Sequence, residues 1–232
     1  MSRSDDVNQY YEALKCLHQS VGGYRYLQDC TAKSGWPQRG VYFFLENGEL
    51  RADGSTLRVT RVGTHAVSAN SKTTLWNRLH THRGHSDGRG NHRGSVFRKR
   101  VGEALLSKEI YSEEIHDTWG IGDTAEKTVR ITEGPLEVAV SRYIGEMPFL
   151  WLDINDAPSP TSRRAYIERN CIALLSNFEK EPIDPPSTNW LGRNSGQRTI
   201  VHSGLWNTDY VGERYDREFL TEFAHLVALG TP

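Results

Sequence analysis

The sequence predicts an α+β fold: a small antiparallel sheet of about three strands flanked by helices. Two observations lead to this expectation. Short runs of β-branched and aromatic residues, as in 40–45 and 56–63, are separated by turn residues, which is typical of strands in an antiparallel sheet. Longer segments, as in 161–178 and 216–229, place apolar residues every three or four positions, which is typical of amphipathic helices. With 232 residues, the chain is long enough for one sizeable domain with flanking segments.

The expected elements can be followed along the chain. Helical spacing predicts a first helix over 5–18 and a shorter one over 24–32. The strands 40–45 and 56–63 are expected to pair as a hairpin, because the sequence between them is rich in turn residues such as Asn47-Gly48. The later expected elements are helices over 73–82 and 94–106, a short helix over 123–129, strands over 136–144 and 149–154, a helix over 161–178, a short strand or extended loop over 199–206, and a helix over 216–229.

The composition excludes several classes of protein. No apolar run reaches the roughly eighteen residues that a membrane-spanning helix needs, and the polar N-terminus does not read as a signal peptide. The three cysteines, Cys16, Cys30 and Cys171, are widely spaced and odd in number, which fits neither a disulfide framework nor a zinc knuckle. These features predict a cytoplasmic protein with no membrane partner.

One segment, 72–100, is strongly basic. It holds eight Lys and Arg residues and one acid, Asp87, whereas the whole chain has a net charge of −1. Such a local excess of positive charge on a nearly neutral protein predicts an anionic partner bound at one place. Four histidines in and near this segment have irregular spacing and no cysteine close by, which argues against a zinc site.

Four short motifs stand in a suggestive order. Gly40-Val41-Tyr42 lies in the first expected strand of the hairpin and Arg61-Val62-Gly63 in the second; Arg78 lies in the next helix and Glu168 in a later one. This order resembles the GIY-YIG nuclease superfamily, whose members have a small antiparallel sheet flanked by helices. His82 follows Arg78 by four residues, which is similar to the restriction-endonuclease-like branch of that superfamily.

The resemblance implies an endonuclease that hydrolyses DNA phosphodiester bonds with Mg²⁺, for which Mn²⁺ can substitute, and points to a restriction or defence role. Arg78 would neutralise charge on the phosphate with its planar donors, and Glu168 would hold the metal as a hard oxygen ligand. Tyr42 and His82 would together orient and deprotonate the attacking water, and either could be the base. An asparagine completes such sites; Asn207 is the preferred candidate and Asn177 the alternative. The expected DNA contacts are Arg61, Lys72, Arg83, His92, Arg93, Arg98 and Arg100.

The chain also departs from the family pattern. Arg61 stands where the second motif has a tyrosine, and eighteen residues separate it from Tyr42, more than is usual. A literal Tyr143-Ile144-Gly145 occurs too late in the chain and is interpreted as coincidence. The substitution at Arg61 keeps a second hypothesis open, a non-catalytic nucleic-acid-binding module. A third is a protein whose basic loop binds an acidic protein. In a further alternative, Glu168 only forms a salt bridge with Arg164, which lies four residues earlier on the same helix.

The resemblance also implies a domain organisation. Residues 1–36 form an N-terminal helical flank, 37–180 a GIY-YIG-like catalytic module with a basic insertion at 83–133, and 181–232 a C-terminal helical extension packed on the module. One site cuts one strand at a time, so a homodimer is a possible means of cutting both strands.

Overall fold

The computed structural model describes residues 2–230 and confirms the α+β class. Its four strands form one antiparallel sheet in the spatial order β1-β4-β2-β3, so β2 is internal and β3 lies at an edge. No helix within the described residues combines the length and apolar character needed to cross a bilayer. The strands are β1 (Arg25–Tyr26), β2 (Gly40–Leu50), β3 (Leu57–Gly63) and β4 (Pro148–Asp153).

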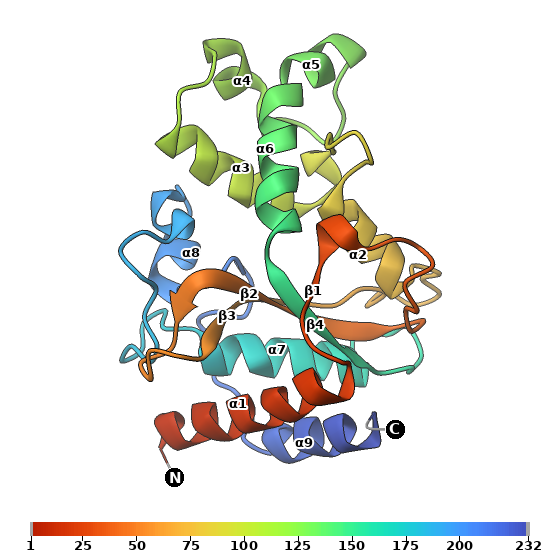
Figure 1. Cartoon of the computed structure of the whole chain (residues 1–232), viewed down its shortest axis with the longest axis vertical. Coiled ribbons are helices and arrows are strands. Elements are labelled where there is room, and N and C mark those ends of the chain that lie inside the picture. The colour runs from red at the N-terminus through yellow and green to blue at the C-terminus, as the bar shows by residue number, and fades with distance from the viewer. Residues whose placement is uncertain (1, 231–232) are drawn as a thin grey trace.

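Helices cover both faces of this sheet (Figure 1). The α-helices are α1 (Arg3–Ser20), α2 (Leu75–Arg83), α3 (Val96–Lys108), α4 (Glu113–Thr118), α5 (Lys127–Thr132), α6 (Gly134–Gly145), α7 (Arg163–Leu175), α8 (Arg198–Ser203) and α9 (Phe219–Leu229). The 3-10 helices are η1 (Leu27–Asp29), η2 (His92–Gly94) and η3 (Leu191–Asn194). The helices predicted near the start and end of the chain, and those at α2, α3 and α7, are therefore confirmed.

Alternating side chains of β2 divide the interior into two cores. Val41, Phe43 and Leu45 pack with α1, α7 and α9, whereas Tyr42 and Phe44 pack with α2, α3 and α6. Successive side chains of a strand point to opposite faces, so this one strand contributes to both layers. The two layers lie below and above the sheet in Figure 1.

The predicted hairpin of β2 and β3 is confirmed, but its turn lies later than Asn47-Gly48. The chain reverses at Asp53-Gly54, where Gly54 has a φ of 70° and the Asp53 carboxylate accepts hydrogen bonds from the backbone of Ser55 and Thr56. Asn47-Gly48 instead lies within β2, where the pairing register with β3 shifts. A β-bulge tolerates glycine with positive φ, so the same residue pair serves a different purpose.

The expected strand at 136–144 is wrong, because this segment forms α6. Leu136, Val140 and Ile144 are fully buried and recur every four residues, and this helical spacing outweighs the shorter alternation that suggested a strand. Pro135 lies in the first turn of α6, where proline is compatible with a helix. The literal Tyr143-Ile144-Gly145 therefore ends a helix and does not occupy a strand.

Two shorter expectations are also wrong. The helix expected over 24–32 is a two-residue strand, β1, followed by η1, because Arg25 and Tyr26 pair with the free edge of β4. The strand or extended loop expected over 199–206 begins as helix α8. Gly204, with a φ of 74°, ends that helix. The Trp206 amide then donates a hydrogen bond to the carbonyl of Thr60 on β3 (2.7 Å).

A buried carboxylate, Glu46, links the sheet to the elements packed around it. It accepts hydrogen bonds from the phenol of Tyr143 on α6 and from the indole nitrogens of Trp190 (3.0 Å) and Trp206 (3.3 Å). Burial raises the pKa of Glu46, while these three donors act in the opposite direction. The acid is therefore held in place by partners from three separate parts of the chain.

The two motifs contain glycines at positions where another part of the chain passes too close for a side chain. Gly63 pairs directly with Tyr42, and a methyl group on Gly63 would overlap the Tyr42 phenol; one on Gly40 would overlap the carbonyl of Leu152. The Tyr42 ring can therefore lie across β3 only because residue 63 has no side chain.

We expect Gly63→Ala to lower the free energy of unfolding by about 1–3 kcal/mol, because the added methyl displaces a buried ring. Urea denaturation would measure the change. Gly196→Ala is the matched control, since nothing lies within 4 Å of the position where its Cβ would be placed. Equal stabilities for the two variants would contradict this account of Gly63.

Candidate functional site

A cleft of about 600 Å³ lies at the β3 side of the sheet, where elements from both faces meet. It is bounded by β2, β3, α2, α3, α7 and the loop after α8. The residues predicted from sequence that line this cleft are Tyr42, Arg61, Arg78, His82, Arg100, Glu168 and Asn207. The structure thus brings together side chains that are far apart in the sequence.

The floor of the cleft holds a hydrogen-bonded pair, Tyr42 and His82. The phenol oxygen of Tyr42 lies 2.8 Å from His82 Nε2, and His82 Nδ1 lies 2.8 Å from the hydroxyl of Ser95. Ser95 also caps α3 by accepting a hydrogen bond from the Arg98 amide. One chain of contacts therefore joins β2, α2 and the start of α3.

Burial determines the protonation of this pair. It raises the pKa of Tyr42, although the charges of Arg61 and Arg78 act in the opposite direction. Burial lowers the pKa of His82 well below its ordinary value, and the same two arginines lower it further. At neutral pH, Tyr42 is therefore protonated and His82 is uncharged.

Two guanidinium groups reach the cleft in different states. Arg78 is half-buried, and its side chain makes no hydrogen bond or ion pair with any of residues 2–230. Arg61 donates from Nη1 to the carbonyl of Trp206 (2.9 Å) and lies over the Phe97 ring, 4.6 Å from its centroid. The buried Nε of Arg61 has no hydrogen-bond partner within the described chain. Arg78 therefore offers the cleft donors that none of the described residues uses.

Glu168 reaches the cleft from α7. One of its carboxylate oxygens accepts a hydrogen bond from the Thr64 amide (2.9 Å), just past the end of β3. Burial raises the pKa of Glu168 to about 7, and the Thr64 amide and the charges of Arg61 and Arg78 only partly oppose this. A half-buried carboxylate with such a pKa lacks a strong cationic partner.

The alternative that Glu168 serves only as the partner of Arg164 is wrong. The Arg164 guanidinium is fully buried, forms an ion pair with Asp156 and donates to the carbonyls of His65 and Ala66. These contacts hold the backbone that follows β3 against the start of α7. Arg164 thus supports the wall of the cleft and forms no ion pair with Glu168.

The donor set suits a hydrated magnesium ion better than a zinc ion. Within residues 2–230, no group of three His, Cys, Asp or Glu side chains could hold a metal together. Mg²⁺ keeps most of its waters and takes one or two carboxylates, and the second oxygen of Glu168 accepts no hydrogen bond from the described residues. The raised pKa of Glu168 is the perturbation that a bound cation would reverse.

Only one of the two candidate asparagines lies in the cleft. Asn207 accepts from the Val62 amide (3.1 Å) and donates to the Val62 carbonyl (2.8 Å), so its side chain pairs with the edge of β3. Asn177 instead bonds to the backbone of Ile183 and to Arg3, outside the cleft. Because the Asn207 amide makes both of these bonds to β3, its position fits a residue that holds the strand in place.

The cleft also contains residues that the sequence motifs did not indicate. His65 is buried, with no hydrogen-bond partner for either ring nitrogen among residues 2–230, and burial together with the charge of Arg164 lowers its pKa to about 4. Asp209 and Tyr210 line the cleft from the loop after α8, and the charge of Asp209 helps to raise the pKa of Glu168. Two features of the sequence could have pointed to these residues: His65 lies two positions after Gly63, and Asp209 and Tyr210 closely follow Asn207.

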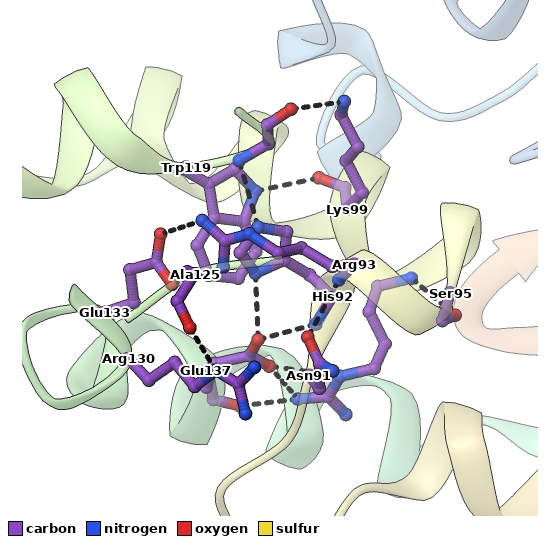
Figure 2. Close-up of polar contacts among 12 residues, drawn as sticks. Asn91, His92, Arg93, Ser95, Lys99, Trp119, Ala125, Arg130, Glu133 and Glu137 are labelled. Atoms are coloured by element: carbon purple, nitrogen blue, oxygen red, sulfur yellow. Dashed lines mark hydrogen bonds and ion pairs between the residues drawn. The ribbon is translucent and has the colours of Figure 1, made fainter. Parts of the chain in front are cut away.

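Three expected DNA contacts are corrected by the structure: Arg98, His92 and Arg93. The Arg98 side chain is fully buried and forms an ion pair with Glu137 on α6 (2.5 Å). His92 Nδ1 lies 2.9 Å from the same carboxylate, and Arg93 forms an ion pair with Glu133 (2.7 Å), as Figure 2 shows. These side chains join the η2–α3 segment to α6 and cannot contact a phosphate from where they lie.

This network depends on the charge of Glu137. Burial alone would raise the pKa of Glu137, but its hydrogen bonds with His92 and the charge of Arg98 outweigh burial and lower that pKa. A lowered carboxyl pKa stabilises the folded protein above the ordinary range for glutamate, and this stabilisation is lost as the pH falls through the lowered value. His92 also stacks on Trp119, with ring centroids 3.8 Å apart, so charge and packing act together.

The remaining basic residues lie in different places. Arg100 lines the cleft and forms an ion pair with Glu103 on the same helix (2.8 Å). Lys72 is exposed in the loop that borders the cleft, between two residues that line it. Arg83 donates to the carbonyl of Leu27 (3.0 Å), away from the cleft. Arg61, Arg100 and Lys72 are thus the members of the predicted set that can meet a ligand in or beside the cleft.

We expect Glu137→Ala to lower the free energy of unfolding by about 3–5 kcal/mol, because it leaves the buried charge of Arg98 without a partner. Glu103→Ala is the matched control. It removes the partner of Arg100 at a more exposed position, where such pairs contribute about 1 kcal/mol or less. Urea denaturation of both variants would measure the difference, and a similar small loss in each would overturn the assigned role of Glu137.

Comparison with known proteins identifies one family. A family model described as GIY-YIG domain matches residues 1–231, nearly the whole chain. No curated protein and no solved structure matches the chain.

Proposed function

The chain belongs to the GIY-YIG domain family, and from this premise we propose that it is a divalent-metal-dependent DNA endonuclease. GIY-YIG domains are nuclease domains, so membership supports nuclease-type chemistry. The observation that carries the finer proposal is the convergence of the unpaired Arg78, the Tyr42–His82 pair and the Glu168 carboxylate on one cleft. A restriction or other defence role is the setting that we propose for this activity.

Binding of the scissile phosphate falls to Arg78 and Arg61. A guanidinium group presents planar donors that match two phosphate oxygens, and Arg78 has no competing partner in the described chain. Arg61 lines the same cleft and adds a second positive charge there. Such fixed positive groups stabilise the charge that grows on the phosphate in the transition state. Arg61 thus supplies positive charge where the family motif has a tyrosine.

Activation of the attacking water falls to Tyr42 and His82 acting in series. In our proposal, the water gives its proton to the Tyr42 oxygen while the Tyr42 proton passes to His82 Nε2, across the 2.8 Å hydrogen bond. Tyr42 stays neutral throughout, which fits its raised pKa. A phosphate bound between Arg61 and Arg78 would offset the charges that lower the pKa of His82. The substrate would thereby make His82 a stronger base.

Glu168 would hold the metal ion. A bound Mg²⁺ or Mn²⁺ supplies Lewis-acid stabilisation of the negative charge on the leaving oxygen. The Thr64 amide keeps one carboxylate oxygen oriented, and the other oxygen is available for coordination. Asn207 contributes indirectly, because it holds the edge of β3 from which Arg61 projects.

One observation favours a second candidate, a nucleic-acid-binding module without catalysis. Arg61 replaces the tyrosine of the second motif, and a module that no longer cleaves would tolerate this change. Against this, a module that only binds has no need of a carboxylate with a free oxygen beside an unpaired arginine. Cleavage assays separate the two functions directly.

We expect Glu168→Gln to reduce plasmid nicking in Mg²⁺ by about 100-fold or more, because the amide keeps the shape of the side chain but is a poor metal ligand. Glu113→Gln, on the exposed surface of α4, is the control and should cleave normally. Undiminished cleavage by Glu168→Gln would remove this residue from the site. DNA binding by the wild-type protein without any cleavage in Mg²⁺ or Mn²⁺ would favour the binding module.

We expect the Mg²⁺ concentration needed for half-maximal cleavage to fall as the pH rises through about 7. The pKa of Glu168 is raised to about 7, so protons compete with the metal below this value and no longer do so above it. On the acid side the requirement should change by up to about tenfold per pH unit. Mg²⁺ titrations between about pH 6 and pH 8 would measure it. A requirement independent of pH in this range would contradict the role given to Glu168.

A further inference from the structure

We propose that the protein binds DNA that carries unpaired bases beside the cleavage point, and that Trp76 on α2 stacks on one of them. This inference rests on the proposed nuclease function and adds a substrate class to it. Helix α2 presents different residues on its two flanks. Arg78 and His82 are four residues apart and reach the cleft, while Trp76 and His80 are four apart and lie on the other flank.

The surface beside the cleft is hollowed along α2. A hollow of about 520 Å³, which we call the α2 hollow, shares Thr73 and Arg78 with the cleft. A second hollow of about 490 Å³, the Trp36 hollow, shares Trp76 with the first. The cleft and the two hollows therefore adjoin one another in order, with Arg78 lining both members of the first pair and Trp76 both members of the second.

The rings along this series are arranged for stacking. Trp76 lies on Trp36 with centroids 5.2 Å apart and planes 16° from parallel, and Trp36 lies in the same way on the buried Phe149, 6.1 Å and 17° away. The indole nitrogen of Trp36 donates to the carbonyl of Thr31 (2.7 Å), which fixes the orientation of that ring. Both tryptophans are half-buried, so a supported stack of rings reaches the surface at Trp76.

The polar groups around these rings favour an anionic ligand. Neither hollow is lined by an acidic residue, whereas Lys33 lines the Trp36 hollow and Arg78 lines the α2 hollow. The guanidinium of Arg25 lies 4.9 Å from the ring centroid of Trp151, which itself contacts Trp36. The indole nitrogen of Trp76 makes no hydrogen bond with the described residues, so it is free to donate to a ligand. Positive charge and partly exposed rings together match a nucleic-acid strand better than an acidic peptide.

The same features select unpaired bases. In a duplex the base faces are stacked on one another and cannot reach a ring on a protein surface. A single strand leaving the cleft past Arg78 can place a base against Trp76, and aromatic stacking accepts any base because every base has a π-face. A strand with its phosphate at Arg78 would thus be cut next to a junction between paired and unpaired DNA.

The test compares two DNA probes without metal, so that binding is measured and no cleavage occurs. One is a blunt duplex, and the other is the same duplex with a single-stranded thymine extension, tested at its 5′ and 3′ ends. By fluorescence anisotropy at one fixed salt concentration, we expect the extended probe to bind roughly tenfold more tightly. Trp76→Ala should remove this preference, and Trp76→Phe, which keeps a ring, should retain most of it.

The controls separate loss of stacking from loss of fold. Ile131→Ala changes an exposed apolar residue on α5 and should keep the preference. Unchanged binding of Trp76→Ala to the blunt duplex would show that the variant is folded. A second readout needs no variant: 2-aminopurine placed in the extension next to the duplex should lose fluorescence when it stacks on the wild-type protein.

Equal affinity of the wild type for both probes, or an unquenched 2-aminopurine signal, would overturn the inference. An equal weakening of both probes by Trp76→Ala would overturn the assignment to Trp76. Neither result depends on the nuclease proposal, because the binding assay contains no metal. Normal cleavage of blunt duplex with no preference for extensions would contradict this inference and leave the nuclease proposal standing. A clear binding preference for the extended probe without any cleavage would contradict the nuclease proposal and leave this inference standing.

Discussion

The hydrogen bond between Tyr42 and His82 is the contact on which the site depends. It joins an internal strand of the sheet to the helix that carries Arg78, and it forms only because Gly63 lets the phenol cross β3. Ser95 holds the other side of the imidazole and caps α3, so the same contact orients the helical layer. Because β2 contributes to both cores, the position of this pair is set by packing on both faces of the sheet.

The charged groups of the cleft have few partners among the described residues. Arg78 has no hydrogen-bond or ion-pair partner in the described chain, and Arg61 Nε has no hydrogen-bond partner there. Burial raises the pKa of Glu168 to about 7, and the charges of Arg61 and Arg78 only partly oppose this. The protein could have paired these charges with one another, yet it holds them apart on β3, α2 and α7. A phosphate at the arginines and a cation at the carboxylate would each relieve one of these imbalances.

Sequence patterns predicted the class of fold, most helices and several of the residues that meet in the cleft, because motif order reflects the order of the elements. They failed where partners come from distant segments. The positive charges of the basic segment could be counted from the sequence, but their acidic partners could not be identified. Glu133 and Glu137 lie some forty residues later, near or within a stretch expected to be a strand. That single error in secondary structure left Arg98 with no visible partner and made a buried ion pair resemble a DNA contact. His65 belongs to no motif, so its place could be seen only in three dimensions.

The buried carboxylate of Glu46 has a consequence for building chimaeras with relatives. Its three hydrogen-bond donors come from α6, from the segment before η3 and from the loop after α8, while the acid itself belongs to β2. Exchanging α6 alone for that of another family member would remove the phenol unless the graft brought its own tyrosine. Helix α6 therefore cannot be exchanged by itself: it must be transplanted together with the strand whose acid it contacts.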